Sequence, residues 1–439
     1  MSKAATQPQL EVERLELPNG LVLLLSENHA LPAVSINALA LAGSRYEADE
    51  QAGLASLVGK LLDEGTESHT SQQIAEAVES VGGRFRSFGD YQVSGVQSAF
   101  LAQDLRLGLE MTANVLMNAT FPEDQMRLHV SRRVAQIKSR LDVPRIQASD
   151  IFNEIVFKGH PQQRPSIGYE ATLTQLTRDD AAMFYRRYFV PNNTLLSIVG
   201  DFNREDLKTQ VAELFGQWQR ADDFNAPELP TLSRQTAPLE RFIAAQKEQV
   251  NIYIGHLGID RKNPDYYALL VMDTILGSSP GFTSRIPRIL RDEQGLAYTT
   301  FSNMTASAGL DAGRFTAFIG TSPDNLDKAL AGLRHEIRRI TEEPVTESEI
   351  ASAKAYLTGN FVFDFQTNAQ IAGFLAEAEI YALGFDYLKA YPELIRAVSI
   401  EDVSRVTRQY LAPDALTTVV VGPVDENGKL LEQNRTMAQ

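Results

Sequence analysis

Two segments of this chain repeat one another at a fixed distance, and this repeat constrains the fold more than any other feature. The segment LTRDDAAMFYRRYFVPNNTLLSIVG aligns with VSIEDVSRVTRQYLAPDALTTVVVG at an offset of 222 residues (410 − 188, 413 − 191 and 422 − 200). Three matched pairs carry this alignment: Tyr188 and Tyr410, Pro191 and Pro413, and Gly200 and Gly422. Each copy has a Thr or Ser helix N-cap, an amphipathic helix, and an apolar strand after Tyr-x-x-Pro. The chain is therefore predicted to be a duplication.

The hydrophobic patterns predict an α+β fold in each copy. Alternating residues in VERLEL, the turn Pro18-Asn19-Gly20 and the run LVLLLSE are typical of a β-hairpin. Grouped strands followed by grouped helices indicate a mainly antiparallel sheet covered by helices. We expect one domain at 10–218, a polar, proline-containing linker at 219–239, and a homologous second domain at 240–425.

Composition excludes several classes of function. The net charge of −15, from 41 basic and 56 acidic residues, argues against a nucleic-acid partner. No run approaches the roughly 18 apolar residues of a membrane helix, so no membrane partner is expected. The absence of cysteine excludes disulfides, thiolate metal sites and a cysteine nucleophile.

Five segments follow one another in order over nearly the whole chain: NGLVLLLSE, LALAGSRYEADEQAGLASLVGKLLDEGT, VFKGHPQQRPSIG, YFVPNNTLLSIVGDF and SRIPRILRDEQGLAYTTFS. In these segments the chain resembles the pitrilysin (inverzincin) metallopeptidase family. The resemblance implies two like-folded domains that form half of a clamshell around an unfolded peptide. The two halves of such enzymes are fused or are separate subunits, and one half carries a zinc-binding H-x-x-E-H helix.

The family's H-x-x-E-H falls on Ser56-Leu57-Val58-Gly59-Lys60, so both histidine ligands and the catalytic glutamate are missing. The apolar stripe of this helix persists, because Leu54, Leu57, Val58 and Leu61 follow helical spacing. The family's more distant glutamate ligand falls near Gln136, and an amide is a poor zinc ligand. No two of the six histidines lie three to five residues apart. We therefore expect no metal or other cofactor in this chain, and zinc in a partner subunit.

Arg291 and Tyr298 are the candidate catalytic residues. They lie seven residues apart around Gly295, which is expected to end a helix. This spacing matches an Arg/Tyr pair that the family uses in its zinc-free half. The resemblance implies that Tyr298 donates a hydrogen bond to the scissile carbonyl oxygen and that Arg291 binds a peptide carbonyl, both in trans with the partner's zinc site. The alternative is an arginine paired with Asp292 or Glu293 and a tyrosine packed in the sheet.

These inferences predict the non-zinc-binding subunit of a heteromeric zinc metallopeptidase. Such a chain is inactive alone, and it needs a homologous H-x-x-E-H subunit and a peptide substrate. A structural or assembly protein of the same fold, or a peptide-binding homodimer without turnover, are the alternatives. Because bacterial relatives are often exported, we expect a periplasmic location, with the cytoplasm as the alternative.

Overall fold

The structure is a computed structural model that describes residues 10–279 and 284–431. Its internal contacts separate two compact units, which are described one at a time. The first unit contains the described residues up to Ile137, together with Arg164–Leu229 and Val362–Leu388. The second contains Lys138–Gln163, Pro230–Phe361 and the described residues from Lys389 onward.

The first unit is built on a six-stranded sheet with the order β1-β2-β6-β3-β5-β4. Its strands are β1 (Glu13–Glu16), β2 (Val22–Glu27), β3 (Ala33–Ala40), β4 (Arg84–Gly89), β5 (Ser94–Leu101) and β6 (Thr194–Gly200). The predicted opening hairpin is confirmed, because β1 pairs antiparallel with β2. Gly20 has φ 88° in the connecting turn, a conformation that glycine adopts without strain. β2 and β6 form the parallel pair of this sheet.

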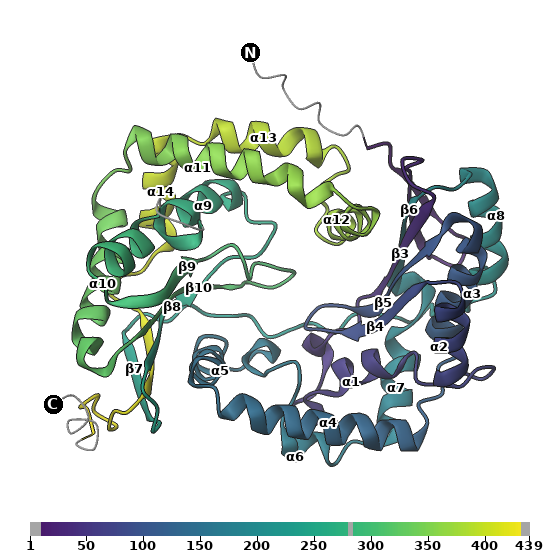
Figure 1. Cartoon of the computed structure of the whole chain (residues 1–439), viewed down its shortest axis with the longest axis horizontal. Helices are drawn as coiled ribbons and strands as arrows, with labels where there is room; N and C mark the ends of the chain where they lie inside the picture. The colour runs from purple at the N-terminus through teal and green to yellow at the C-terminus, as the bar shows by residue number, and fades with distance from the viewer. Residues whose placement is uncertain (1–9, 280–283, 432–439) are drawn as a thin grey trace. The chain divides into compact units, whose positions relative to one another are not determined.

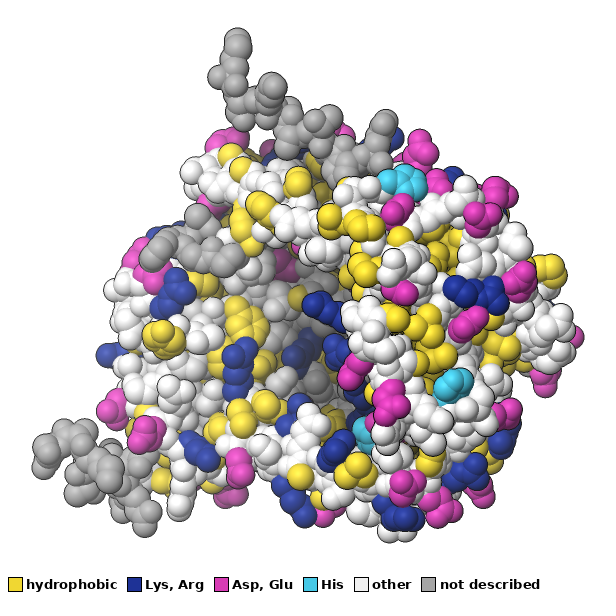
Figure 2. Space-filling view, turned by 45° about the vertical axis from the view of Figure 1, so that its right-hand side comes forward, with side chains coloured by type: hydrophobic (Ala, Val, Ile, Leu, Met, Phe, Trp, Pro, Cys, Tyr) yellow, Lys and Arg dark blue, Asp and Glu magenta, His cyan; other side chains and the backbone are white. Residues whose placement is uncertain are grey.

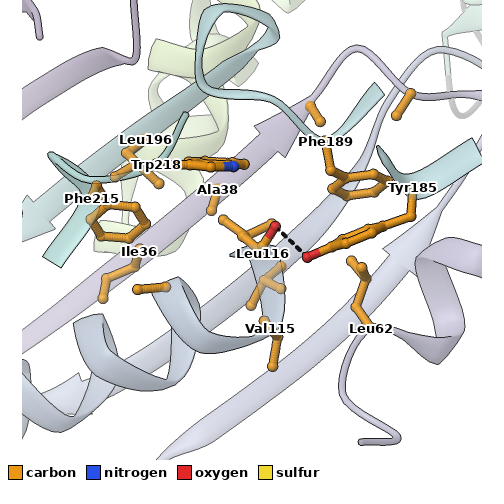
Figure 3. Close-up of a cluster of buried hydrophobic side chains, with 14 of the residues drawn as sticks. Ile36, Ala38, Leu62, Val115, Leu116, Tyr185, Phe189, Leu196, Phe215 and Trp218 are labelled. Carbon is orange, nitrogen blue, oxygen red and sulfur yellow. Dashed lines mark hydrogen bonds between the residues drawn. The ribbon is translucent and has the colours of Figure 1, made fainter. Parts of the chain in front are cut away.

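Helices bury one face of this sheet in the core of the first unit. They are α1 (Leu54–Leu61), α2 (Ser71–Ser80), α3 (Leu105–Met117), α4 (Glu123–Leu141), α6 (Glu170–Leu173), α7 (Arg178–Tyr188) and α8 (Arg204–Phe215). Figure 3 shows part of this core, where Ile36 and Ala38 of β3 lie among side chains of α3, α7 and α8. Tyr185 is buried there, and its hydroxyl donates to the carbonyl of Leu116 at 2.8 Å. The aromatic ring thereby fills the core while its polar atom is satisfied.

The second unit is built on a five-stranded sheet with the order β7-β11-β8-β10-β9. Its strands are β7 (Leu239–Ala244), β8 (Val250–Leu257), β9 (Ala297–Asn303), β10 (Arg314–Thr321) and β11 (Thr417–Gly422). Its α-helices are α5 (Pro144–Val156), α9 (Tyr266–Asp273), α10 (Leu326–Glu342), α11 (Glu347–Asn360), α13 (Tyr387–Ala397) and α14 (Ile400–Tyr410). Two π-helical segments, Thr274–Ser278 and Pro287–Glu293, lie between α9 and β9.

The two units confirm the duplication and the predicted fold class. β6 lies between a parallel neighbour, β2, and an antiparallel neighbour, β3, and β11 lies in the same way between β7 and β8. The preceding helices also begin alike, because both N-caps form a reciprocal capping box. Thr177 pairs with Asp180 before α7, and Ser399 pairs with Asp402 before α14. Both units are α+β, with mainly antiparallel sheets covered by helices.

One helix of each repeat covers the sheet of the other repeat. α12 (Asn368–Ile380) comes from the second half of the sequence but packs on β3 and β6, while α5 comes from the first half and packs on β8 and β11 (Figure 1). The Asn368 side chain ties α12 to the first sheet by donating to the carbonyl of Ala33 at 2.9 Å. Each compact unit is thus made from both halves of the chain, whereas the division at 10–218 and 240–425 describes the repeat along the sequence and stays a prediction.

Among the described residues, no helix combines the length and the apolar character needed to cross a membrane.

Candidate functional site

The helix at the family's zinc motif is present in the first unit. α1 begins after Gly53, which has φ 100°. The four apolar residues of its predicted stripe are each at most 1% exposed. The helix therefore folds as its hydrophobic stripe predicts. What differs from a zinc site is the set of side chains and backbone atoms at Ser56, Gly59 and Lys60.

Ser56 is buried and is hydrogen-bonded to an arginine. The Ser56 hydroxyl donates to the carbonyl of Ser166 at 2.6 Å and accepts from Nη1 of Arg133 at 2.8 Å. Nη2 of Arg133 donates to the Ser56 carbonyl at 2.6 Å. Burial lowers the pKa of Arg133 to about 10, against the attraction of Glu47. The guanidinium stays a cation, so this position repels a divalent metal.

Gly59 is the residue that the sequence aligns with the family's catalytic glutamate, and backbone atoms fill the space that a side chain would need there. A Cβ at Gly59 would lie 2.6 Å from the carbonyl carbon of Phe88 and 2.7 Å from Cα of Gly89, both in β4. A Cβ at Gly89 would in turn lie 2.9 Å from Cα of Ser56. The two glycines thus allow α1 and β4 to touch, and no larger side chain fits between them.

Lys60 is the residue that the sequence aligns with the second histidine ligand. Its ammonium group donates to the carbonyl of Ser87 at 2.8 Å. Burial is the main reason that its pKa is lowered, and the nearby cation Arg86 lowers it further. The residues at this position are donors and cations, so they do not fit zinc, which needs lone pairs from imidazole, thiolate or carboxylate.

Gln136 is exposed on α4, whereas Arg133, three residues earlier, donates to Ser56 of α1. In the described ranges, 10–279 and 284–431, no group of three or more histidine, aspartate or glutamate side chains is arranged to hold a metal ion. The first unit therefore offers neither a metal ligand set nor a carboxylate placed to activate water at this position.

Arg291 lies in the second unit, in the π-helical segment Pro287–Glu293. Its Nε donates to Asp292 at 2.7 Å, and this hydrogen bond raises the pKa of Arg291 and lowers that of Asp292. The local ion pair is one of the two features that a purely structural role predicts. About a third of the Arg291 side chain is exposed, so part of the guanidinium faces solvent.

Tyr298 does not pack in the sheet and is 92% exposed. Ala297 pairs with Thr321 and Thr299 pairs with Gly320, so the register shifts and Tyr298 is the extra residue of a β-bulge. A bulge in an edge strand redirects a side chain, and β9 is the last strand of its sheet. Tyr298 therefore presents its hydroxyl to solvent from a strand that the sheet holds in place.

A cavity of about 650 Å³ lies beside Tyr298 within the second unit. Its lining includes Arg145 at the start of α5, Lys247 in the loop before β8, and Phe318 and Gly320 of β10. The sequence did not identify Arg145, Lys247 or the contact of Arg133 with Ser56, because none of these residues belongs to a local motif. Arg133 lies three residues before Gln136, so both lie close together on α4. This spacing is the one sequence signal that could have identified Arg133.

Comparisons with known proteins point to one family. The family described as "Insulinase (Peptidase family M16)" matches residues 22–169, and "Peptidase M16 inactive domain" matches residues 175–357. An "Uncharacterized zinc protease" of Rickettsia bellii is 26% identical over 418 residues, covering 94% of this chain and 98% of the relative. One of Mycobacterium tuberculosis is 25% identical over 437 residues, covering 99% of each chain.

Solved structures show the same fold. The crystal structure of a peptidase M16 inactive domain from Pseudomonas fluorescens superposes with a TM-score of 0.88 at 23% identity, covering 95% of this chain and 99% of that one. A protease from Helicobacter pylori superposes with a TM-score of 0.85 at 20% identity, covering 94% and 100%. The duplicated α+β units, the two family matches along the sequence and these folds agree, and the chain belongs to peptidase family M16, the insulinase or pitrilysin family.

Proposed function

We propose that this chain is the non-zinc-binding subunit of a heteromeric zinc metallopeptidase. The observation that carries the proposal is the exposure of Tyr298 on a bulge of an edge strand. In the same chain, the residues of α1 that align with the zinc motif do not fit zinc. A tyrosine that served only the fold would be expected to bury its ring. An exposed aromatic side chain on a rigid strand suits contact with another molecule.

The partner in this proposal is a homologous chain that carries H-x-x-E-H. Zinc bound there would supply the activated water for peptide hydrolysis. The Tyr298 hydroxyl would donate a hydrogen bond to the scissile carbonyl oxygen as negative charge develops on it. Arg291 would donate to a backbone carbonyl of the peptide.

A second candidate function is peptide binding without turnover, or a structural or assembly role. The absence of space for a glutamate at Gly59 and the cavity beside β9 are also compatible with a protein that binds an extended peptide without cleaving it. The two functions differ in one respect, because only the first requires the chain to raise the activity of a zinc-bearing partner.

The test is hydrolysis of a quenched fluorescent, unfolded peptide by this chain, by an H-x-x-E-H homologue, and by their mixture, each with and without a chelator. The proposal expects chelator-sensitive hydrolysis that is far faster in the mixture than in either chain alone. Hydrolysis by this chain alone would contradict it. No gain on mixing would favour the binding or structural role.

The cellular location belongs to the same proposal, which places the chain and its partner in the periplasm. Fractionation of cells that express the full-length protein tests this part separately. Recovery with cytoplasmic markers would replace the periplasm by the cytoplasm and leave the enzymatic proposal intact.

A further inference from the structure

The cavity beside Tyr298 lies over the part of the second sheet that α5 does not cover. α5 packs on β8 and β11, and its Phe152 contacts the ring of Tyr253, with 6.0 Å between centroids. The helix begins at Pro144, and beyond this point the sheet is open over Gly320 of β10. A Cβ at Gly320 would meet no atom closer than 3.6 Å, so the missing side chain, and not a close backbone contact, leaves the space.

The floor of the cavity contains a polar group that lacks a partner. Asn251 lines the cavity and is 6% exposed, and in the part of the chain that the structure describes its carboxamide makes no hydrogen bond. The carboxamide atoms are not fully excluded from solvent, so they are accessible to a molecule in the cavity. Such a group is expected to be satisfied by a ligand or by water that enters the cavity.

The rim of the cavity is cationic. The Arg145 guanidinium lies 4.8 Å from the ring centroid of Phe318 and 5.5 Å from that of Phe301. Within residues 10–279 and 284–431, neither Arg145 nor Lys247 forms an ion pair, and the one carboxylate at the lining is that of Glu248. Stacking fixes the plane of the guanidinium and leaves its N–H edge available for a carboxylate.

This local excess of cations contrasts with the rest of the chain. The net charge is −15, and the acidic side chains are scattered over the face that Figure 2 shows. The chain as a whole is acidic, whereas at this cavity a carboxylate meets Arg145, Lys247 and the amide of Asn251.

We infer that this cavity binds a carboxylate of an extended peptide that lies along the edge strand β9, next to Tyr298. Arg145 and Lys247 supply the charge, the Asn251 amide donates a hydrogen bond, and the Phe318 ring contacts the aliphatic part of the ligand. The carboxylate comes either from an acidic side chain or from the peptide C-terminus. The inference rests on the proposed function only in taking a peptide as the ligand.

The experiment measures binding of short, fluorescently labelled peptides to the full-length chain alone by anisotropy. The first two peptides differ at one central residue, which is Glu in one and Gln in the other. They carry no other charged side chain and have amidated C-termini. The third is the Gln peptide with a free C-terminal carboxylate. We expect at least one of the two carboxylate peptides to bind about tenfold more tightly than the amidated Gln peptide, and the difference to shrink at high salt.

Three variants locate the site. Gly320→Leu fills the cavity without a backbone clash, and Arg145→Gln removes a charge, so both are expected to abolish the preference for a carboxylate. Gly359→Leu is the matched control, because Gly359 lies on α11 with nothing within 4 Å of a built Cβ. This control is expected to bind like the wild type.

The outcomes separate this inference from the proposed function. Preference for the Glu peptide identifies a side-chain carboxylate, and preference for the free C-terminus identifies a terminal one. Equal binding of all three peptides, or an unchanged preference in Gly320→Leu, would overturn the inference. If the preference is present but mixing with a zinc-bearing homologue yields no hydrolysis, the cavity stands and the partner-subunit proposal falls.

Discussion

A Cβ on Gly59 would lie 2.6 Å from the carbonyl carbon of Phe88, well inside the contact distance of two carbon atoms. The backbone of β4 therefore fills the space of a side chain at Gly59, the residue that the sequence aligns with the glutamate of H-x-x-E-H. At this position the chain departs from the motif in packing as well as in side chains. Two predictions follow from this contact.

The first concerns the smallest possible side chain. Gly59→Ala is expected to lower the free energy of unfolding by about 1–3 kcal/mol, because α1 and β4 must separate to admit one methyl group. Urea denaturation measures this change. Gly359→Ala, in an open helical position, should leave stability unchanged or raise it by up to about 1 kcal/mol. Equal effects at the two glycines would show that the α1–β4 contact is not tight.

The second concerns reconstruction of the motif. The triple variant Ser56→His, Gly59→Glu, Lys60→His is expected to bind no stoichiometric zinc, because Arg133 lies against Ser56 and Phe88 lies against Gly59. Metal analysis after gel filtration and the melting temperature check this expectation. A folded triple variant that retains one zinc per chain would refute the packing argument.

The exposed tyrosine predicts a separation of activity from stability. Tyr298→Phe should reduce the kcat of the mixed enzyme about 10²–10³-fold, as the loss of one oxyanion donor does. Its effect on the free energy of unfolding should stay within about 0.5 kcal/mol, because the hydroxyl is on a side chain that is 92% exposed. Tyr381→Phe in the first unit is a control for the loss of a tyrosine hydroxyl, which there accepts from Gln92, and it should retain full activity. Unchanged kcat in Tyr298→Phe would remove Tyr298 from the catalytic proposal.

A buried ion pair in the second unit predicts acid sensitivity. Arg285, 3% exposed, donates to Glu349 at 2.6 and 3.0 Å. Burial alone would raise the pKa of Glu349, but hydrogen bonds from Arg285 and Thr346 outweigh it and lower the pKa to about 2. The folded-state pKa is below the unfolded one, so the stabilisation is complete above about pH 4.5 and is lost as the pH falls toward 2.

Urea denaturation at several pH values measures this loss. The wild type should lose about 1 kcal/mol more than Glu349→Gln between roughly pH 6 and pH 3, after allowance for solvent screening of a partly exposed carboxylate. Glu347→Gln, an exposed neighbour in the first turn of α11, should follow the wild type. Parallel pH curves for the wild type and Glu349→Gln would contradict the assignment.

The features that the sequence predicted are those written in local patterns. The hairpin at Asn19-Gly20, the stripe of α1 and the paired N-caps Thr177 and Ser399 depend on neighbouring residues, and all are present. The register of Tyr298 depends on β10, which lies further along the chain, so no local pattern announced the bulge. Arg133 and Gln136 differ by less than one turn of α4, and only the packing of that helix against α1 decides between them.

The exchange of α5 and α12 was also beyond prediction, because an amphipathic helix does not specify which of two similar sheets it covers. It has a consequence for the ancestry of the chain. In a precursor with a single copy of the repeat, one face of the sheet would have been uncovered unless two identical molecules exchanged this helix by domain swapping. Gene fusion would then have fixed this exchange within one polypeptide. A break in the linker should therefore leave two fragments that remain associated, since neither fragment carries all the parts of either unit.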